Sequence, residues 1–195
     1  MKNKTKIIKL ILIIILINLF IIIFCFKQIS NKTQSDDFLF LKLFQSQSKT
    51  AEEEYSFKVN YLNKGLKTVN LSDTINKNFY KKVAPGTNGK FNIVLNSTRD
   101  LQYQVKFSST SAKPQNLKFM ALTNGEKITK ASELEELSEN LKGIILKNQK
   151  VSITVLWYWP YEGENQEEQV DIQDTIDGKN IEKYKFDILV LGEEV

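Results

Sequence analysis

The sequence predicts an all-β fold: an antiparallel β-sandwich, jelly-roll-like, with one short helix and a membrane-spanning segment in front of it. Several short segments alternate apolar and polar residues, which is the period of a strand with one buried face. Turn-forming residues separate these segments at short intervals, as is typical of sandwiches and jelly rolls. A long apolar run near the N-terminus predicts the membrane segment.

The N-terminal region, residues 1–26, has the features of a signal-anchor or a signal peptide. Four lysines lie among the first nine residues, and the apolar run counted from Ile7 to Phe26 approaches the roughly 20 residues that span a bilayer. The lysines favour the cytoplasmic side, which places the remainder outside the cell. A cleavable signal has a shorter apolar region followed by small residues, but the first alanine is Ala51. A retained anchor is therefore favoured, and a secreted or matrix protein remains the alternative if the leader is cleaved.

Residues 27–51 form a polar stalk that contains a second apolar run, Phe38–Phe44. This run does not alternate, so its period does not separate helix from strand. One interpretation is that it packs on the domain or continues the membrane helix. The functional interpretation is an assembly strand, in which Phe38, Phe40 and Phe44 share one face.

The third region, residues 52–195, is the expected extracytoplasmic β-sandwich. Pro85 and Gly86 predict a turn before one strand, Gly89 a second bend, and Asn63–Gly65 a further turn. The expected strands are Tyr55–Tyr61, Val69–Leu71, Phe91–Leu95, Leu101–Phe107, Leu117–Phe119, Val151–Trp159 and Tyr184–Val190.

One helix is expected between Ser132 and Gly143. Ser132 and Glu135 have the spacing of a capping box. Leu134, Leu137 and Leu141 would share one face, and Gly143 would end the helix.

The composition excludes several classes of enzyme. The chain has no histidine and a single cysteine, Cys25, inside the apolar run, so it has no His-dependent triad and no usual zinc ligand set. No nucleophile, phosphate-binding or metalloprotease motif occurs. We therefore predict no catalytic residue and no cofactor. The net charge of +4 comes partly from the N-terminal lysines, so no nucleic-acid partner is expected.

Two groups of residues are candidates for binding. Asp171, Asp174 and Asp177 in the acidic stretch Glu162–Asp177 are weak candidates for a cation site, because hard cations prefer clustered carboxylates. Their spacing is not that of an EF-hand, and a solvated hairpin is the favoured interpretation. Trp157 and Trp159 would stack on sugars if exposed, but they continue an inward face, so core packing is favoured.

Three motifs resemble the TasA/camelysin family of secreted bacterial proteins: Val83–Phe91, Ile153–Glu162 and Asp174–Thr175. The similarity extends from about Tyr55 to the C-terminus. The resemblance implies a jelly-roll domain outside the cell, often released by a dedicated signal peptidase. The best-known members assemble into fibres of the biofilm matrix, and the camelysin branch carries a metallopeptidase label. This chain departs from the family in having a long leader without an evident cleavage site, and in lacking histidine.

The expected function is a non-enzymatic structural protein of the cell surface or biofilm matrix. Its expected partners are the membrane, through Ile7 to Phe26, and copies of itself or related fibre subunits, with a dedicated signal peptidase possible. The alternative is an extracytoplasmic camelysin-like metallopeptidase, and a weaker alternative is a polysaccharide-binding module.

The lysine-rich start predicts that residues 52–195 lie outside the cell. Protease added to intact cells, with the wall removed if necessary, should digest this domain, as followed by immunoblotting. Protection of the domain until the membrane is broken would contradict the predicted topology.

Overall fold

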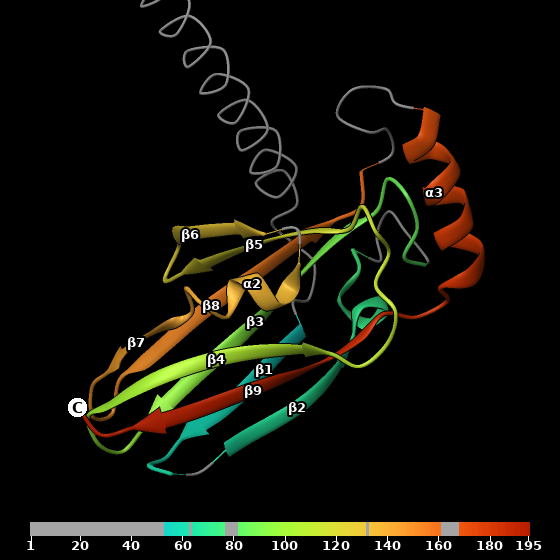
Figure 1. The fold of residues 1–195 in the computed structure, drawn as a ribbon. Helices are drawn as coiled ribbons and strands as arrows, with labels where there is room; N and C mark the ends of the chain where they lie inside the picture. The colour runs from blue at the N-terminus through green and yellow to red at the C-terminus, as the bar shows by residue number, and fades with distance from the viewer. Residues whose placement is uncertain (1–52, 63, 77–81, 132, 161–167) are drawn as a thin grey trace, which may run out of the picture. The chain divides into compact units, whose positions relative to one another are not determined.

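The computed structural model describes residues 53–62, 64–76, 82–131, 133–160 and 168–195 (Figure 1). These residues belong to one compact unit, Thr50–Val195. The predicted membrane run Ile7–Phe26 and the Phe38–Phe44 segment lie outside the described residues. Within the described ranges, no helix combines the length and the apolar character needed to cross a membrane.

The described strands form two sheets, which confirms the predicted all-β sandwich. The first is a five-stranded sheet in the order β1 (Glu53–Val59), β3 (Asn88–Ser97), β8 (Lys150–Tyr158), β5 (Lys118–Thr123) and β6 (Glu126–Ala131). The second is a four-stranded sheet in the order β2 (Lys64–Asn70), β9 (Lys185–Glu193), β4 (Leu101–Ser109) and β7 (Lys142–Ile145). Strands β6 and β7 were not predicted from the sequence.

The core lies between the two sheets and is built by period-2 alternation. Phe91, Ile93 and Leu95 of β3 are fully buried, while the residues between them are partly exposed. Strands β4, β8 and β9 contribute in the same way, as predicted. Among the described residues, the core cluster extends from Phe57 to Val190, which gives the unit Thr50–Val195 a hydrophobic core of its own.

Strand β1 differs from the prediction because it pairs parallel with β3, from Glu53 beside Phe91 to Val59 beside Ser97. The chain reverses after β1 and again after β2, so β1 and β3 run in the same direction (Figure 1). The turn predicted at Asn63–Gly65 lies earlier, because Tyr61 and Leu62 form a turn and β2 begins at Lys64.

The described helices also differ from the prediction. The expected helix from Ser132 to Gly143 is reduced to α2 (Leu134–Leu137), and Gly143 lies in β7. Leu134, Leu137 and Leu141 are buried as expected. The helix ends early because the chain continues from Lys142 as strand β7, which pairs with β4. The N–H of Glu133 donates to Oε2 of Glu136 at 3.5 Å, one residue later than the predicted capping box. A short 3₁₀ helix, Leu71–Thr74, precedes β3.

The turn before β3 is confirmed, and the predicted bend at Gly89 is wrong. Gly86 has a φ of 83°, and the N–H of Thr87 donates to the carbonyl of Ala84 at 3.0 Å. Gly89 instead lies within β3, directly opposite Trp157. A Cβ at this position would lie 2.6 Å from the Trp157 ring and would also clash with the carbonyl of Thr74. Glycine is therefore needed here for close packing.

This packing predicts a large difference between two glycine substitutions. Gly89→Ala should lower the free energy of unfolding by about 1–3 kcal/mol or more, because overpacking against a ring and a backbone atom forces both to move. Gly178→Ala is the matched control, since its Cβ would meet nothing closer than Pro85 at 3.8 Å. Because Gly178 lies within helix α3, its replacement by alanine should leave the free energy of unfolding unchanged or raise it by up to about 1 kcal/mol. Urea unfolding of residues 50–195 measures both, and equal effects would contradict the packing argument.

Candidate functional site

Trp157 and Trp159 are part of the core, as predicted. Their side chains are 0% and 1% exposed. The Trp157 Nε1–H donates to Oγ1 of Thr74 at 2.8 Å, and the Thr74 hydroxyl donates to the carbonyl of Leu71 at 2.8 Å. Because both indoles are buried, they offer no surface platform for stacking on a sugar.

The acidic stretch predicted as a solvated hairpin contains a helix instead, α3 (Glu168–Asn180), which carries Asp171, Asp174 and Asp177. A spacing of three residues places neighbouring aspartates on one side of a helix. Asp174 and Asp177 are buried, 4% and 7% exposed. The side chain of Asp171 lies outside the described part of the structure. The side of α3 that faces the domain is therefore acidic.

The two buried carboxylates hold α3 against the domain through hydrogen bonds. Oδ1 of Asp174 accepts from the Trp159 Nε1–H and from Nδ2 of Asn116, both at 2.8 Å. Oδ2 of Asp177 accepts from the backbone N–H of Gln115 at 2.7 Å, and its Oδ1 accepts from Nε2 of Gln173 at 2.7 Å. Two of these donors, Asn116 and the backbone of Gln115, come from a loop about 60 positions earlier in the chain, so no local sequence pattern marks them.

The geometry gives these aspartates a structural role. Three of the four oxygens of Asp174 and Asp177 accept hydrogen bonds, and Oδ2 of Asp174 is buried without a partner. Among the described residues, no group of three or more His, Cys, Asp or Glu side chains lies close enough to hold a metal ion. The cation site suggested by the three aspartates stays a prediction.

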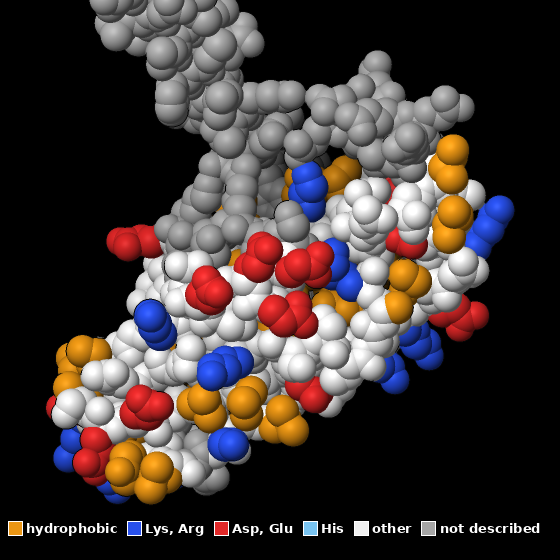
Figure 2. Space-filling view, in the orientation of Figure 1, with side chains coloured by type: hydrophobic (Ala, Val, Ile, Leu, Met, Phe, Trp, Pro, Cys, Tyr) orange, Lys and Arg blue, Asp and Glu red, His pale blue; other side chains and the backbone are white. Residues whose placement is uncertain are grey.

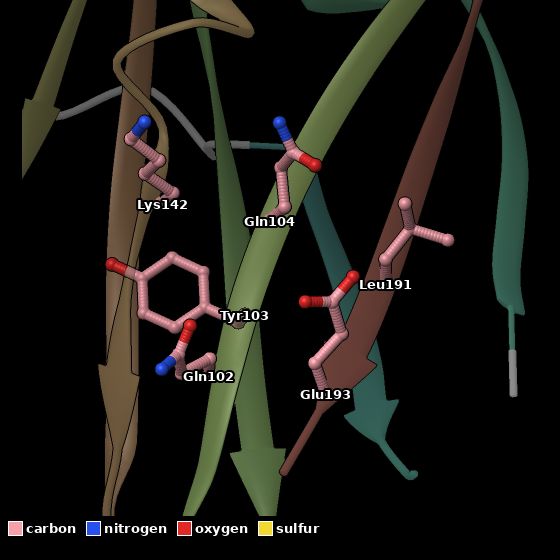
Figure 3. Close-up of a pocket in the computed structure, with 6 residues that line it drawn as sticks. All are labelled: Gln102, Tyr103, Gln104, Lys142, Leu191 and Glu193. Atoms are coloured by element: carbon pink, nitrogen blue, oxygen red, sulfur yellow. The ribbon is translucent and has the colours of Figure 1, made fainter. Parts of the chain in front are cut away.

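A polar hollow of about 220 Å³ lies at the four-stranded sheet (Figure 3). Six residues from β4, β7 and β9 line it: Gln102, Tyr103, Gln104, Lys142, Leu191 and Glu193. Figure 3 shows Lys142 on one side of β4 and Leu191 and Glu193 on the other. Gln102 and Gln104 are on the outward half of the β4 alternation, which in the sequence looks like any solvated face, whereas Tyr103 is on the inward half.

The chemistry of the hollow suits hydrogen bonding to a polar or charged group. Gln102 and Gln104 supply amide donors and acceptors, Lys142 a positive charge and Glu193 a negative one. Tyr103 belongs to the core, and burial raises the pKa of its hydroxyl. Donors, acceptors and charges of both signs gathered in one hollow suit the binding of a polar group.

The predicted assembly residues Phe38, Phe40 and Phe44 lie outside the described residues. The strand that follows them in the chain, β1, is at the edge of the five-stranded sheet. Its second edge pairs with no other strand in the described ranges. This edge is the described feature nearest in sequence to the predicted assembly segment.

The bonds at Asp174 predict a measurable loss of stability. Asp174→Ala should lower the free energy of unfolding by about 2–4 kcal/mol, because it leaves two buried donors without an acceptor. Thr175→Ala, at an exposed position of the same helix, should change stability by less than about 0.5 kcal/mol. Chemical unfolding followed by tryptophan fluorescence measures both.

A double-mutant cycle separates this bond from a general effect on the helix. Trp159→Phe removes the indole donor, so the double variant with Asp174→Ala should be more stable than the sum of the single losses predicts. Strict additivity would show that the hydrogen bond between these two side chains contributes nothing to stability.

Comparison with known proteins shows no match to a family model or to a curated protein sequence. Three solved structures are similar in outline only. The pre-peptidase C-terminal domain of a Bacillus anthracis collagenase has 7% identity and a TM-score of 0.35, with 73% of this chain and 99% of that chain covered. The Aeromonas hydrophila periplasmic inhibitor of g-type lysozyme, PliG, has 10% identity and a TM-score of 0.33, with 73% and 100% covered. The extracellular region of zebrafish Gpr126/Adgrg6 has 9% identity and a TM-score of 0.33, with 74% and 15% covered.

Proposed function

We propose that this chain is a non-enzymatic structural protein of the cell surface or biofilm matrix that associates with copies of itself or with related fibre subunits. Residues 7–26 would anchor it in the membrane or serve as its export signal, with the domain outside the cell. This proposal follows the resemblance to the TasA/camelysin family. Its support in the domain comes from one feature, the edge strand β1.

Strand β1 carries the proposal because it is a sheet edge directly downstream of the predicted assembly segment. An edge strand presents unpaired N–H and C=O groups, and an extended segment from another molecule can add to them. The apolar residues Phe38, Phe40 and Phe44 suit such an added strand, since they can fill a groove on the neighbour. A contact in which one end of a molecule binds a different surface of the next does not close, and therefore grows a filament.

The jelly-roll assignment belongs to this proposal. Without β1, eight strands remain in two four-stranded sheets, β3-β8-β5-β6 and β2-β9-β4-β7. Eight strands in two packed sheets is the arrangement of a jelly roll. In this assignment, β1 is an extra strand added at the edge of the roll.

No specific observation favours the two alternative functions. A metallopeptidase needs a metal site, and none assembles from the side chains that the structure describes. The polysaccharide-binding alternative was based on Trp157 and Trp159, which are buried.

The assembly proposal predicts a difference between two lengths of chain. Protein starting near Ser35 should form filaments or large oligomers, because it keeps Phe38–Phe44, whereas protein starting near Ala51 should stay monomeric. Phe40→Asp in the longer protein should suppress assembly, since a buried carboxylate without a partner is unfavourable. Light scattering and electron microscopy measure the outcome. Monomers from both lengths, across concentration and pH, would contradict the proposal.

A further inference from the structure

The outer face of the four-stranded sheet carries leucines flanked by lysines. In one row across the strands, Lys106, Leu189 and Leu66 lie side by side. In the next row, Lys142, Gln104, Leu191 and Lys64 lie side by side. Three leucines and three lysines thus form a compact surface, here called the leucine–lysine face. Figure 2 shows hydrophobic side chains gathered over β9 and β2 with lysine side chains beside them.

The leucine–lysine face is open to solvent within the described domain. Leu66 is 61% exposed, Leu189 and Leu191 are partly buried, and the three lysines are exposed. Lys106 and Lys142 form no ion pair with any residue that the structure describes. Core packing does not explain the leucines of β9, because Ile188 and Val190 beside them already fill the inner face.

The acidic residues of this sheet lie at its ends. Asp187 is one row beyond the leucine–lysine face and accepts a hydrogen bond from Oγ1 of Thr68 at 2.6 Å. Glu193 lies in the opposite end row, beside Gln102. On this face, positively charged lysines therefore flank the apolar leucines. Such a surface is complementary to a partner that is both apolar and anionic.

We propose that the leucine–lysine face lies on the surface of an anionic lipid bilayer. Leucine side chains enter the boundary between headgroups and acyl chains, while lysine ammonium groups remain among the phosphates. Each lysine near an anionic leaflet contributes attraction that falls off within a Debye length. In the polar hollow, Lys142 and Gln104 give a headgroup phosphate a cation and amide donors, on the side of β4 away from the Glu193 carboxylate.

A face of this size binds weakly by itself, so tethering strengthens it. The 26 residues between Phe26 and Glu53 would extend to roughly 85 Å, enough to let the four-stranded sheet reach the bilayer if residues 7–26 stay in the membrane. Tethering converts docking into an intramolecular event at a high effective concentration. The face itself is present without the anchor, so the proposal goes beyond the assembly role and is tested separately from it.

The test measures co-sedimentation of purified residues 50–195 with vesicles at low ionic strength. The domain should bind vesicles of phosphatidylglycerol and phosphatidylcholine, and should bind pure phosphatidylcholine far less. The double variant Lys106→Glu with Lys142→Glu should bind at least about tenfold more weakly, because attraction becomes repulsion at two positions. Leu66→Asp should also weaken binding several-fold, since it removes the most exposed leucine of the leucine–lysine face and adds a negative charge.

Lys58→Glu with Lys150→Glu is the matched control. It makes the same change in net charge at exposed positions on the outer face of the five-stranded sheet, and it should retain most of the binding. Tryptophan fluorescence confirms that each variant is folded, because Trp157 and Trp159 report on the core.

Three outcomes would overturn the proposal. The first is an absence of binding to phosphatidylglycerol vesicles. The second is equal weakening by the test and control double variants, which would show that net charge alone acts. The third is equally tight binding to a soluble polyanion, polyglutamate, together with no effect of Leu66→Asp on vesicle binding. That result would assign the face to a polyanionic polymer.

Discussion

The packing of Trp157 against Gly89 is the contact on which one end of the sandwich depends. The register of β3 and β8 places the two residues directly opposite each other, so the indole fills the space where a side chain would project. A buried indole N–H needs an acceptor, and Thr74 provides it from the short helix that precedes β3. One ring thereby fixes the central strand β8, its neighbour β3 and the connection that leads into β3. Two positions further along, Trp159 makes the corresponding bond to α3 through Asp174. The same end of β8 therefore ties both connecting helices to the core.

Most strands could be predicted because each carries its own alternation. Phe91–Leu95 and Tyr184–Val190 alternate so regularly that the inward residues are evident without any knowledge of their partners. The parallel direction of β1 could not be predicted, because Tyr55, Phe57 and Val59 point inward in either direction. Strands β6 and β7 were missed because they are short and lack a repeated alternation. The helix after Ser132 was overextended because Leu141 fits the helical period, although it packs in the core from outside the helix.

Helix α3 could not be predicted because it reverses the usual arrangement of polar and apolar residues. Asp174 and Asp177 face the domain, while Ile172 and Ile176 are 55% and 44% exposed. A search for an apolar helix face does not find this helix. Its buried side is polar and is held by hydrogen-bond donors of the sandwich. Those donors are Trp159, Asn116 and the backbone of Gln115. A carboxylate is stable in such a position only when donors are already fixed around it, so the helix depends on the folded sandwich. The candidate site shares this limitation, since the hollow at β4 joins residues from three strands.

The two proposed surfaces belong to different sheets, and this allows both to operate in one molecule. Strand addition at β1 would continue the five-stranded sheet in its own plane, because new backbone hydrogen bonds form along a strand edge. The leucine–lysine face lies on the outside of the four-stranded sheet, where side chains and not backbone groups meet the partner. A strand added at β1 therefore does not cover Leu189, Leu191 or Lys106. In such an assembly, each subunit would present its lysines again, and several weak lipid contacts in one filament would act together. A surface that binds a single free domain weakly can in this way hold an assembled one more tightly.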